Sequence, residues 1–293
     1  MFFTGTGVAI VTPFKNDSSV DFDALQRIIH HCIEGQVEYV VVLGTTGEAT
    51  TLNTSEKADV VRCVVDTVSG RIPIVVGVSG NDTVKVVDAV KHTNFNGISG
   101  ILSVTPYYNK PSQNGLIEHF KIISAASPVP VILYNVPGRT GVNMTAETTL
   151  TLAHDIDNIV AIKEASGLFP QIMRILKERP ENFSVISGDD AISLPLVAIG
   201  GQGVISVTAN AFPREMSTII RNSLDNHYQE AQMAQYKMLE IFELLFEEGS
   251  PSGIKATLHI LGFSQNVLRL PLMPVSQKLY EKIESFIQKM KES

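Results

Sequence analysis

Eight short apolar segments constrain the fold of this chain more than any other feature of its sequence. Each segment is four or five residues long and largely apolar, without the alternation of a half-exposed strand. Such runs are typical of parallel strands that are buried on both faces. They cover residues 8–11, 39–43, 74–78, 101–104, 131–134, 159–162, 183–186 and 204–207.

The stretches between these runs carry the three- and four-residue spacing of amphipathic helices. Leu25, Ile28, Ile29 and Cys32 show this spacing, and Asn53 stands three residues before a glutamate, which predicts a capping box. Helices are expected over residues 21–33, 53–68, 85–90, 116–123, 146–153, 170–176, 193–198 and 214–224.

Eight strand–helix units in a row most economically close into an α/β fold of the (β/α)₈ barrel type. A doubly wound open sheet is the alternative for the same units. Three further helices are expected near residues 226–247, 252–261 and 275–290. We therefore predict a (β/α)₈ barrel over residues 1–224, which would carry any active site, and a C-terminal helical subdomain over residues 225–293.

Composition and motif content exclude several function classes. The net charge of -7 repels phosphate backbones, so nucleic acid is not expected as a partner. No run approaches the ~18 apolar residues of a membrane span, and residues 1–4 lack the basic start of a secretory signal. We expect a cytoplasmic protein without a membrane partner. Cys32 and Cys63 lie outside any CxxC pattern and no HExxH motif occurs, so neither a disulfide framework nor a metal site is expected.

Polar and aromatic residues follow five of the predicted strands. In a (β/α)₈ barrel the active site is built at the carboxyl ends of the strands, so these segments are expected to gather on one rim. They cover residues 44–48, 105–109, 134–140, 163–165 and 187–190.

Lys163 is the strongest candidate for chemistry. It follows an apolar strand, and desolvation would lower the pKa of its amine. A neutral amine can attack a ketone and form a Schiff base. The position also suits a lysine that extends to solvent or pairs with Glu164, and the residues alone leave these interpretations open.

The other rim residues each allow a functional and a structural interpretation. The turn at residues 44–47 could bind a carboxylate, assisted by the dipole of a helix expected to follow it, or it could be an ordinary βα turn. Tyr108 and Tyr134 could pass protons or simply pack. Arg139 suits a bidentate grip on a carboxylate or a surface ion pair.

Three further patterns are interpreted structurally. The glycine-containing segments at residues 5–7 and 200–203 each precede a strand, whereas a nucleotide loop follows one, so both are predicted to be tight turns. For Asp189 and Asp190, helix capping by one of the two is favoured over an acid pair.

Taken together, the rim motifs resemble the dihydrodipicolinate synthase family, within the pyruvate-dependent class I aldolases. The resemblance extends from about residue 3 to residue 290 of the sequence. It is carried by residues 44–48, 107–109, 134–137, 139–140, 162–165, 187–190 and 203–207, in this order. It implies a (β/α)₈ barrel with a C-terminal helical domain, usually assembled as a dimer of dimers, and no cofactor.

The resemblance also implies the chemistry. Lys163 would form an imine with pyruvate, and Tyr134 would donate and accept protons. Thr45, Tyr134 and Tyr108 would form a proton relay, with Tyr108 supplied by a neighbouring subunit.

The same resemblance implies the substrate contacts. Thr45 and Thr46 would hold the carboxylate of pyruvate, while Gly188 and the backbone carbonyl of Ile205 would line the site. Arg139 would bind the carboxylate of aspartate-β-semialdehyde.

The sequence departs from the family pattern at a regulatory position. Lysine-sensitive members carry a histidine in the second helix and a glutamate early in the third, where this chain has Lys57 and Lys85. Because these cations would repel the ε-amine of lysine, we predict weak inhibition by lysine or none.

Two alternative functions stay open. A sialic acid or keto-sugar-acid lyase would share the lysine and the first tyrosine motif, but usually lacks the arginine found here at position 139. A non-catalytic binding barrel would require loss of the lysine or the relay, and those residues are all present.

Overall fold

Eight parallel strands close into a barrel in which each strand pairs with its neighbours in sequence and β1 pairs with β8. The computed structural model describes residues 3–292. Residues 1–4 are predicted not to begin a secretory signal, and the first two of them lie outside the described residues. The strands are β1 (Gly5–Ala9), β2 (Tyr39–Val42), β3 (Ile74–Gly77), β4 (Gly100–Val104), β5 (Val131–Asn135), β6 (Ile159–Glu164), β7 (Ser184–Ser187) and β8 (Gly203–Ser206). This closure confirms the predicted barrel and excludes the open sheet.

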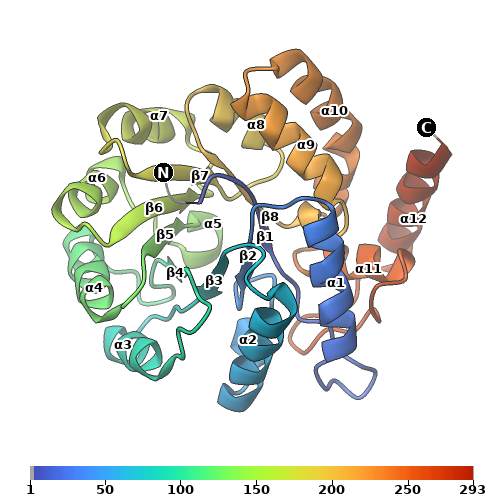
Figure 1. Ribbon diagram of the computed structural model, residues 1–293, viewed down its shortest axis with the longest axis horizontal. Helices are drawn as coiled ribbons and strands as arrows, with labels where there is room; N and C mark the ends of the chain where they lie inside the picture. The colour runs from blue at the N-terminus through green and yellow to red at the C-terminus, as the bar shows by residue number, and fades with distance from the viewer. Residues whose placement is uncertain (1–2, 293) are drawn as a thin grey trace.

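Helices surround the barrel and cover the outer faces of its strands (Figure 1). The α-helices of the barrel are α1 (Phe22–Glu34), α2 (Thr54–Val68), α3 (Thr83–His92), α4 (Gln113–Ala126), α5 (Pro137–Thr140), α6 (Ala146–Asp155), α7 (Phe169–Glu178), α8 (Ser193–Ala198) and α9 (Pro213–Leu224). Two 3₁₀ helices, η1 (Ala49–Thr51) and η2 (Thr208–Asn210), follow β2 and β8. The predicted capping box at the start of α2 is confirmed, because Asn53 and Glu56 each accept a hydrogen bond from the other's backbone N–H.

Glycines form part of the strands where the barrel closes, so the predicted tight turn at residues 5–7 is wrong. Gly5 pairs with Gly203, the first residue of β8. A Cβ on Gly203 would lie 1.9 Å from the Gly5 carbonyl oxygen, and one on Gly7 would lie 2.2 Å from the Tyr39 ring. Glycine lets these backbones approach closely, which a sequence pattern of apolar runs does not reveal.

The core has two parts, as expected for strands that are buried on both faces. One cluster lies between the strands and the surrounding helices and includes Val8, Val40 and Ile162. The other fills the barrel and includes Tyr39, Ile132, Tyr134, Ile186 and Ile205. Alternate residues of each strand therefore supply the two clusters.

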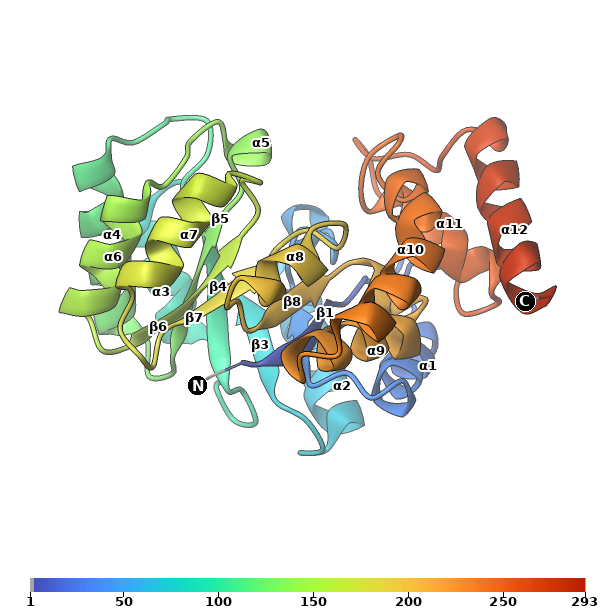
Figure 2. The ribbon, with the colours of Figure 1, turned by 90° about the horizontal axis from the view of Figure 1, so that it is seen from above.

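The C-terminal helices α10 (Tyr228–Leu244), α11 (Ser252–Ile260) and α12 (Gln277–Glu292) lie together at one side of the barrel (Figure 2). Helices α9 and α10 pack against each other across the predicted subdomain boundary. The division into residues 1–224 and 225–293 stays a prediction. Within residues 3–292, no helix is long and apolar enough to cross a membrane.

Candidate active site

Lys163 and Tyr134 lie side by side on neighbouring strands at the carboxyl-terminal rim. The two residues are register partners in the pairing of β5 with β6. The Lys163 Nζ lies 4.4 Å from the centroid of the Tyr134 ring. Both side chains are buried, with 5% and 7% of their surfaces exposed. This burial excludes the interpretation of Lys163 as a lysine that extends to solvent.

Burial changes the acid–base behaviour of Lys163. Desolvation lowers the pKa of its amine from 10.5 to about 8, with a further lowering by Arg139 and an opposing effect of Asp190. At pH 7, a pKa of about 8 leaves ~10% of the amine neutral, whereas the ordinary value leaves ~0.03%. The lysine is therefore suited to nucleophilic attack near neutral pH.

Tyr134 is shifted in the opposite direction. Burial raises the pKa of its phenol to about 12, against the opposing effects of Arg139 and of a hydrogen bond with the Thr45 side chain. The phenol is therefore protonated at neutral pH and begins as a donor. The bond to Thr45 joins the first tyrosine of the predicted relay to the loop after β2.

That loop, residues 44–48, forms a tight turn beside the site. The Gly47 N–H donates to the Gly44 carbonyl oxygen at 3.1 Å, and the Thr12 hydroxyl donates to the Gly47 carbonyl oxygen at 2.7 Å. Thr45 is exposed and Thr46 is buried. The prediction that the dipole of an α-helix acts directly on this turn is wrong, because the short 3₁₀ helix η1 follows the turn and α2 begins only at Thr54.

Gly188 and Ile205 complete the inner wall of the rim. A Cβ at Gly188 would lie 2.7 Å from the Ala165 Cβ and 3.1 Å from the Lys163 Cε. A side chain at position 188 would therefore press on the lysine stem. Ile205 is buried on β8 inside the barrel, with 1% of its surface exposed.

Arg139 and Tyr108 are exposed members of the predicted site. Arg139 is exposed on α5, a single helical turn that the sequence pattern missed, and its Nη2 donates to the Ser250 carbonyl oxygen at 3.3 Å. Tyr108 is 90% exposed and has a left-handed backbone, with φ of 73°. Within one chain, Tyr108 is thus solvent-exposed rather than part of the buried cluster around Lys163.

Neither Asp189 nor Asp190 caps α8 with its side chain, so the prediction that one of the two caps a helix is wrong. The Asp190 Oδ2 accepts hydrogen bonds from the backbone N–H groups of Val207 and Thr208 at 3.1 and 2.9 Å, and from the Thr208 hydroxyl at 2.8 Å. Asp189 Oδ1 accepts from the Ala191 N–H, while α8 begins without a side-chain cap. Asp190 therefore ties the end of β7 to the segment after β8.

Glu164 is a buried carboxylate that sequence reasoning treated only as a possible partner of Lys163. It accepts hydrogen bonds from the Asn135 Nδ2 at 3.1 Å, the Gln171 Nε2 at 3.1 Å and the Ser166 N–H at 2.8 Å. Burial raises the pKa of its carboxyl. Because neighbouring residues of a strand face opposite sides, Glu164 bonds toward the helices and leaves the Lys163 amine inside the barrel.

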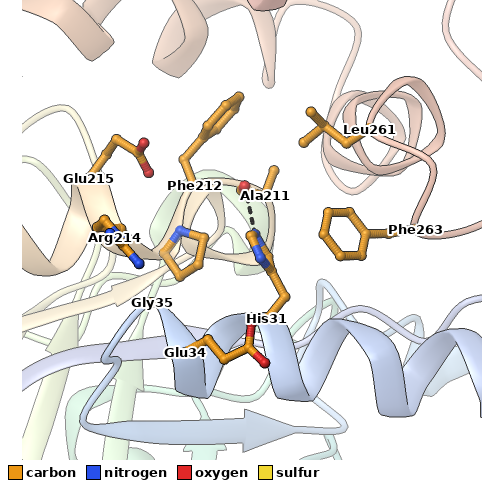
Figure 3. Close-up of a pocket in the computed structure, with 10 residues that line it drawn as sticks. His31, Glu34, Gly35, Ala211, Phe212, Arg214, Glu215, Leu261 and Phe263 are labelled. Atoms are coloured by element: carbon orange, nitrogen blue, oxygen red, sulfur yellow. Dashed lines mark hydrogen bonds between the residues drawn. The ribbon is translucent and has the colours of Figure 1, made fainter. Parts of the chain in front are cut away.

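A pocket of about 270 Å³ lies elsewhere, on the outer side of the barrel between α1, the start of α9 and the segment after α11 (Figure 3). His31, Phe212 and Phe263 are among its lining residues, and none of the predicted site residues belongs to it. In the described part of the chain, no group of three or more His, Cys, Asp or Glu residues could hold a metal ion.

Comparisons with known proteins find similar sequences over nearly the whole chain. The model of the dihydrodipicolinate synthetase family matches residues 2–290. A 4-hydroxy-tetrahydrodipicolinate synthase of Parabacteroides distasonis is 51% identical over 98% of this chain and 96% of its own, and one of Flavobacterium psychrophilum is 49% identical over 98% of each.

Solved structures agree at the level of the fold. Dihydrodipicolinate synthase of Thermotoga maritima superposes with a TM-score of 0.97 at 39% identity, over 99% of both chains. The enzyme of Aquifex aeolicus gives 0.95 at 38% identity, over 99% of this chain and 98% of its own. With this match in sequence and fold, the chain belongs to the dihydrodipicolinate synthetase family.

Proposed function

We propose that the chain is a 4-hydroxy-tetrahydrodipicolinate synthase, a lyase that condenses pyruvate with L-aspartate-4-semialdehyde in lysine and diaminopimelate biosynthesis. The observation that carries the proposal is the buried Lys163 amine, with its lowered pKa, against the Tyr134 ring. The names of relatives about 50% identical over nearly the whole chain support the choice of substrates.

The first half of the reaction uses the acid–base properties of Lys163 and Tyr134. The neutral amine attacks the pyruvate carbonyl carbon, and water leaves as the imine forms. Tyr134, protonated by virtue of its raised pKa, supplies the proton needed for water to depart. Its phenolate oxygen then takes the proton that the pyruvate methyl group loses, and the iminium accepts the electron pair released, which gives an enamine.

In the second half, the enamine carbon attacks the aldehyde carbon of the semialdehyde and the new oxyanion takes up a proton. The amine of the semialdehyde then attacks the imine carbon, displaces Lys163 and closes the ring. Tyr134, Thr45 and Tyr108 form the proposed relay for these protons, with Tyr108 from a neighbouring subunit. Because the iminium is the electron sink, the scheme requires no cofactor.

The proposed substrate contacts use residues of the rim. Thr45 and Thr46 bind the carboxylate of pyruvate, with Gly188 and the Ile205 carbonyl beside it. Arg139, on the exposed turn α5, binds the carboxylate of the semialdehyde. The proposed assembly is a homotetramer built as a dimer of dimers, or at least a dimer, and the proposed location is the cytoplasm. The exposure of Tyr108 supports association of subunits.

Weak lysine inhibition also belongs to this proposal. Lys85 has 85% of its side chain exposed, and its ion pair with Asp82 at 3.7 Å is a weak surface pair, so its cation still repels a lysine amine.

Turnover with two substrate sets tests the function. The purified protein should consume pyruvate when L-aspartate-4-semialdehyde is supplied, and should cleave N-acetylneuraminate at least about a hundredfold less efficiently, because Arg139 selects for an acidic aldehyde. Efficient cleavage of N-acetylneuraminate without turnover of the semialdehyde would contradict the proposal and favour a sialic acid lyase.

A further inference from the structure

Glu48 closes the loop that carries Thr45 and Thr46, but its own side chain has no part in the proposed chemistry. The residue has a left-handed backbone, with φ of 50°, a conformation that residues other than glycine rarely adopt. Its carboxylate is wholly buried. A buried charge at the end of a substrate-binding loop requires a partner, since an uncompensated one is strongly destabilising.

The partners come from the C-terminal part of the chain. The Lys255 Nζ, on α11, forms an ion pair with the Glu48 Oε1, and both side chains are at least 99% buried. The Arg269 backbone N–H donates to the Glu48 Oε2 at 3.1 Å. The same amine of Lys255 donates to the Val267 carbonyl oxygen at 3.0 Å and lies 4.0 Å from the centroid of the Phe14 ring.

Arg269 extends this attachment along the segment between β2 and α2. Its Nη1 donates to the Thr51 carbonyl oxygen at 2.9 Å, and its guanidinium pairs with Glu56 in the first turn of α2 at 2.5 Å. It also lies 4.5 Å from the centroid of the Phe14 ring. The C-terminal segment therefore contacts the stretch between β2 and α2 at three residues, Glu48, Thr51 and Glu56. The first of these closes the loop that carries Thr45 and Thr46.

We propose that Lys255 and Glu48 are positioning residues: their buried ion pair fixes the loop of residues 44–48 in the geometry that binds the carboxylate of pyruvate. The C-terminal helical segment then sets the affinity for pyruvate although it contributes no group to the proposed chemistry. This inference rests on the proposed function. Without the Lys255 cation, the loop must shift to bring the Glu48 carboxylate to water, and the threonine hydroxyls shift with it.

The test measures pyruvate binding in variants of the full-length protein. Borohydride reduction traps the imine, so the pyruvate concentration that gives half-maximal adduct can be compared among Lys255→Met, Glu48→Gln and the double variant. We expect each to raise this concentration by about 10- to 100-fold, the size of effect that a misplacement of about 1 Å produces. The KM for the semialdehyde should stay within about threefold, because Arg139 lies on α5 and its bond to the Ser250 carbonyl oxygen uses a backbone group that none of these substitutions removes.

A surface ion pair of the same helical segment provides the control. Lys282 and Glu247 are paired at 2.7 Å with about 40% of each side chain exposed, so Lys282→Met should leave pyruvate binding unchanged. Thermal melting of every variant separates loss of fold from loss of binding. The double variant buries no unpaired charge, so it should fold even where Lys255→Met does not.

Two results would overturn the inference. One is a folded Lys255→Met or double variant with the pyruvate half-saturation of the wild type. The other is an equal rise in the requirement for both substrates, which would indicate general loosening rather than positioning of one loop. Failure of the wild type to form any adduct would instead refute the proposed function, so the two failures are distinguishable.

Discussion

The chemistry of the site depends on an amine whose pKa is lowered by burial, so that a larger share of it is neutral near pH 7. Lys163 has almost no contact with solvent, and the aromatic ring beside it stabilises a cation less well than water does. Asp190 works against the neutral form, since its charge raises the pKa of the lysine. The balance of these effects, with a pKa of about 8, fixes the pH range over which the site can react.

The first prediction is a pH profile. At limiting pyruvate, the rate of trapped adduct formation should rise about tenfold between pH 7 and pH 9 and level off above that, because the neutral fraction of an amine with pKa about 8 does so. The rate is followed by intact-protein mass after borohydride reduction. A rate that keeps rising tenfold per pH unit to pH 10 would mean that Lys163 titrates as an ordinary lysine.

The second prediction concerns stability. The folded pKa of Lys163, about 8, lies below the ordinary 10.5, so between these values the unfolded state binds more protons and stability rises with pH. Lys163→Met removes this penalty and should raise the free energy of unfolding at pH 7 by up to about 3 kcal/mol. The gain should shrink from about pH 8 toward pH 10.5. Urea unfolding at several pH values measures it, and a less stable variant at pH 7 would contradict the burial argument.

At this scale, the sequence predicts the position of a residue where that position depends on the residue's own strand. Lys163 and Tyr134 were identified because each lies at the end of an apolar run, and the structure makes them neighbours. The partners of Asp190 and Glu48 were not predictable. Asp190 bonds to residues 207 and 208, and Glu48 to residues 255 and 269, contacts set by barrel closure and helix docking rather than local spacing.

At the scale of elements, the site depends on how closely β6 and the end of β7 approach. The Gly188 N–H donates to the Glu164 carbonyl oxygen at 2.8 Å, which brings the glycine against the lysine stem. Any side chain at position 188 must displace the Lys163 stem or the Ala165 methyl group. The glycine is therefore part of what holds the lysine in place.

Gly188→Ala is the third prediction. The added methyl group, 2.7 Å from the Ala165 Cβ, should cost about 1–3 kcal/mol of stability and lower turnover at least about tenfold by moving Lys163. Gly138→Ala is the matched control, because no atom lies within 4 Å of the position of its Cβ. Turnover and melting are measured for both. Equal behaviour of the two variants would show that position 188 does not constrain the lysine.

The boundaries of the helices and strands show which features the sequence pattern predicts and which it misses. The capping box of α2 was predicted because its two partners are three residues apart. The ends of β5 and β6 were placed too early, since Asn135, Lys163 and Glu164 are polar residues that still pair in the sheet. The single turn α5 was missed because four residues are too few for helical periodicity.

At the scale of the whole molecule, the number of strand–helix units was sufficient to predict closure of the barrel. The attachment of α10–α12 to one side of it was not, because their amphipathic faces do not encode where they dock (Figure 2). Assembly is the remaining question at this scale. Tyr108 is exposed on a loop held by hydrogen bonds between Asn81 and residues 107 and 109, so it is available to another subunit.

Subunit complementation is the fourth prediction. Lys163→Ala and Tyr108→Phe subunits should each be nearly inactive. If Tyr108 acts across an interface, a dimer of one subunit of each kind has one complete site, and random mixing should restore about a quarter of wild-type activity. Co-refolded mixtures are assayed, with sedimentation to confirm assembly. Activity no greater than the average of the two parents would show that each chain completes its own site.

The most direct test of the whole account is the site of covalent capture. The protein is incubated with pyruvate and borohydride, and its peptides are mapped by mass. We predict one adduct on Lys163, with a mass increase equal to pyruvate minus water plus two hydrogen atoms, and none in a folded Lys163→Arg variant. An adduct on another lysine, or no adduct in a protein that still turns over both substrates, would contradict the central claim that the buried amine of Lys163 captures the keto acid.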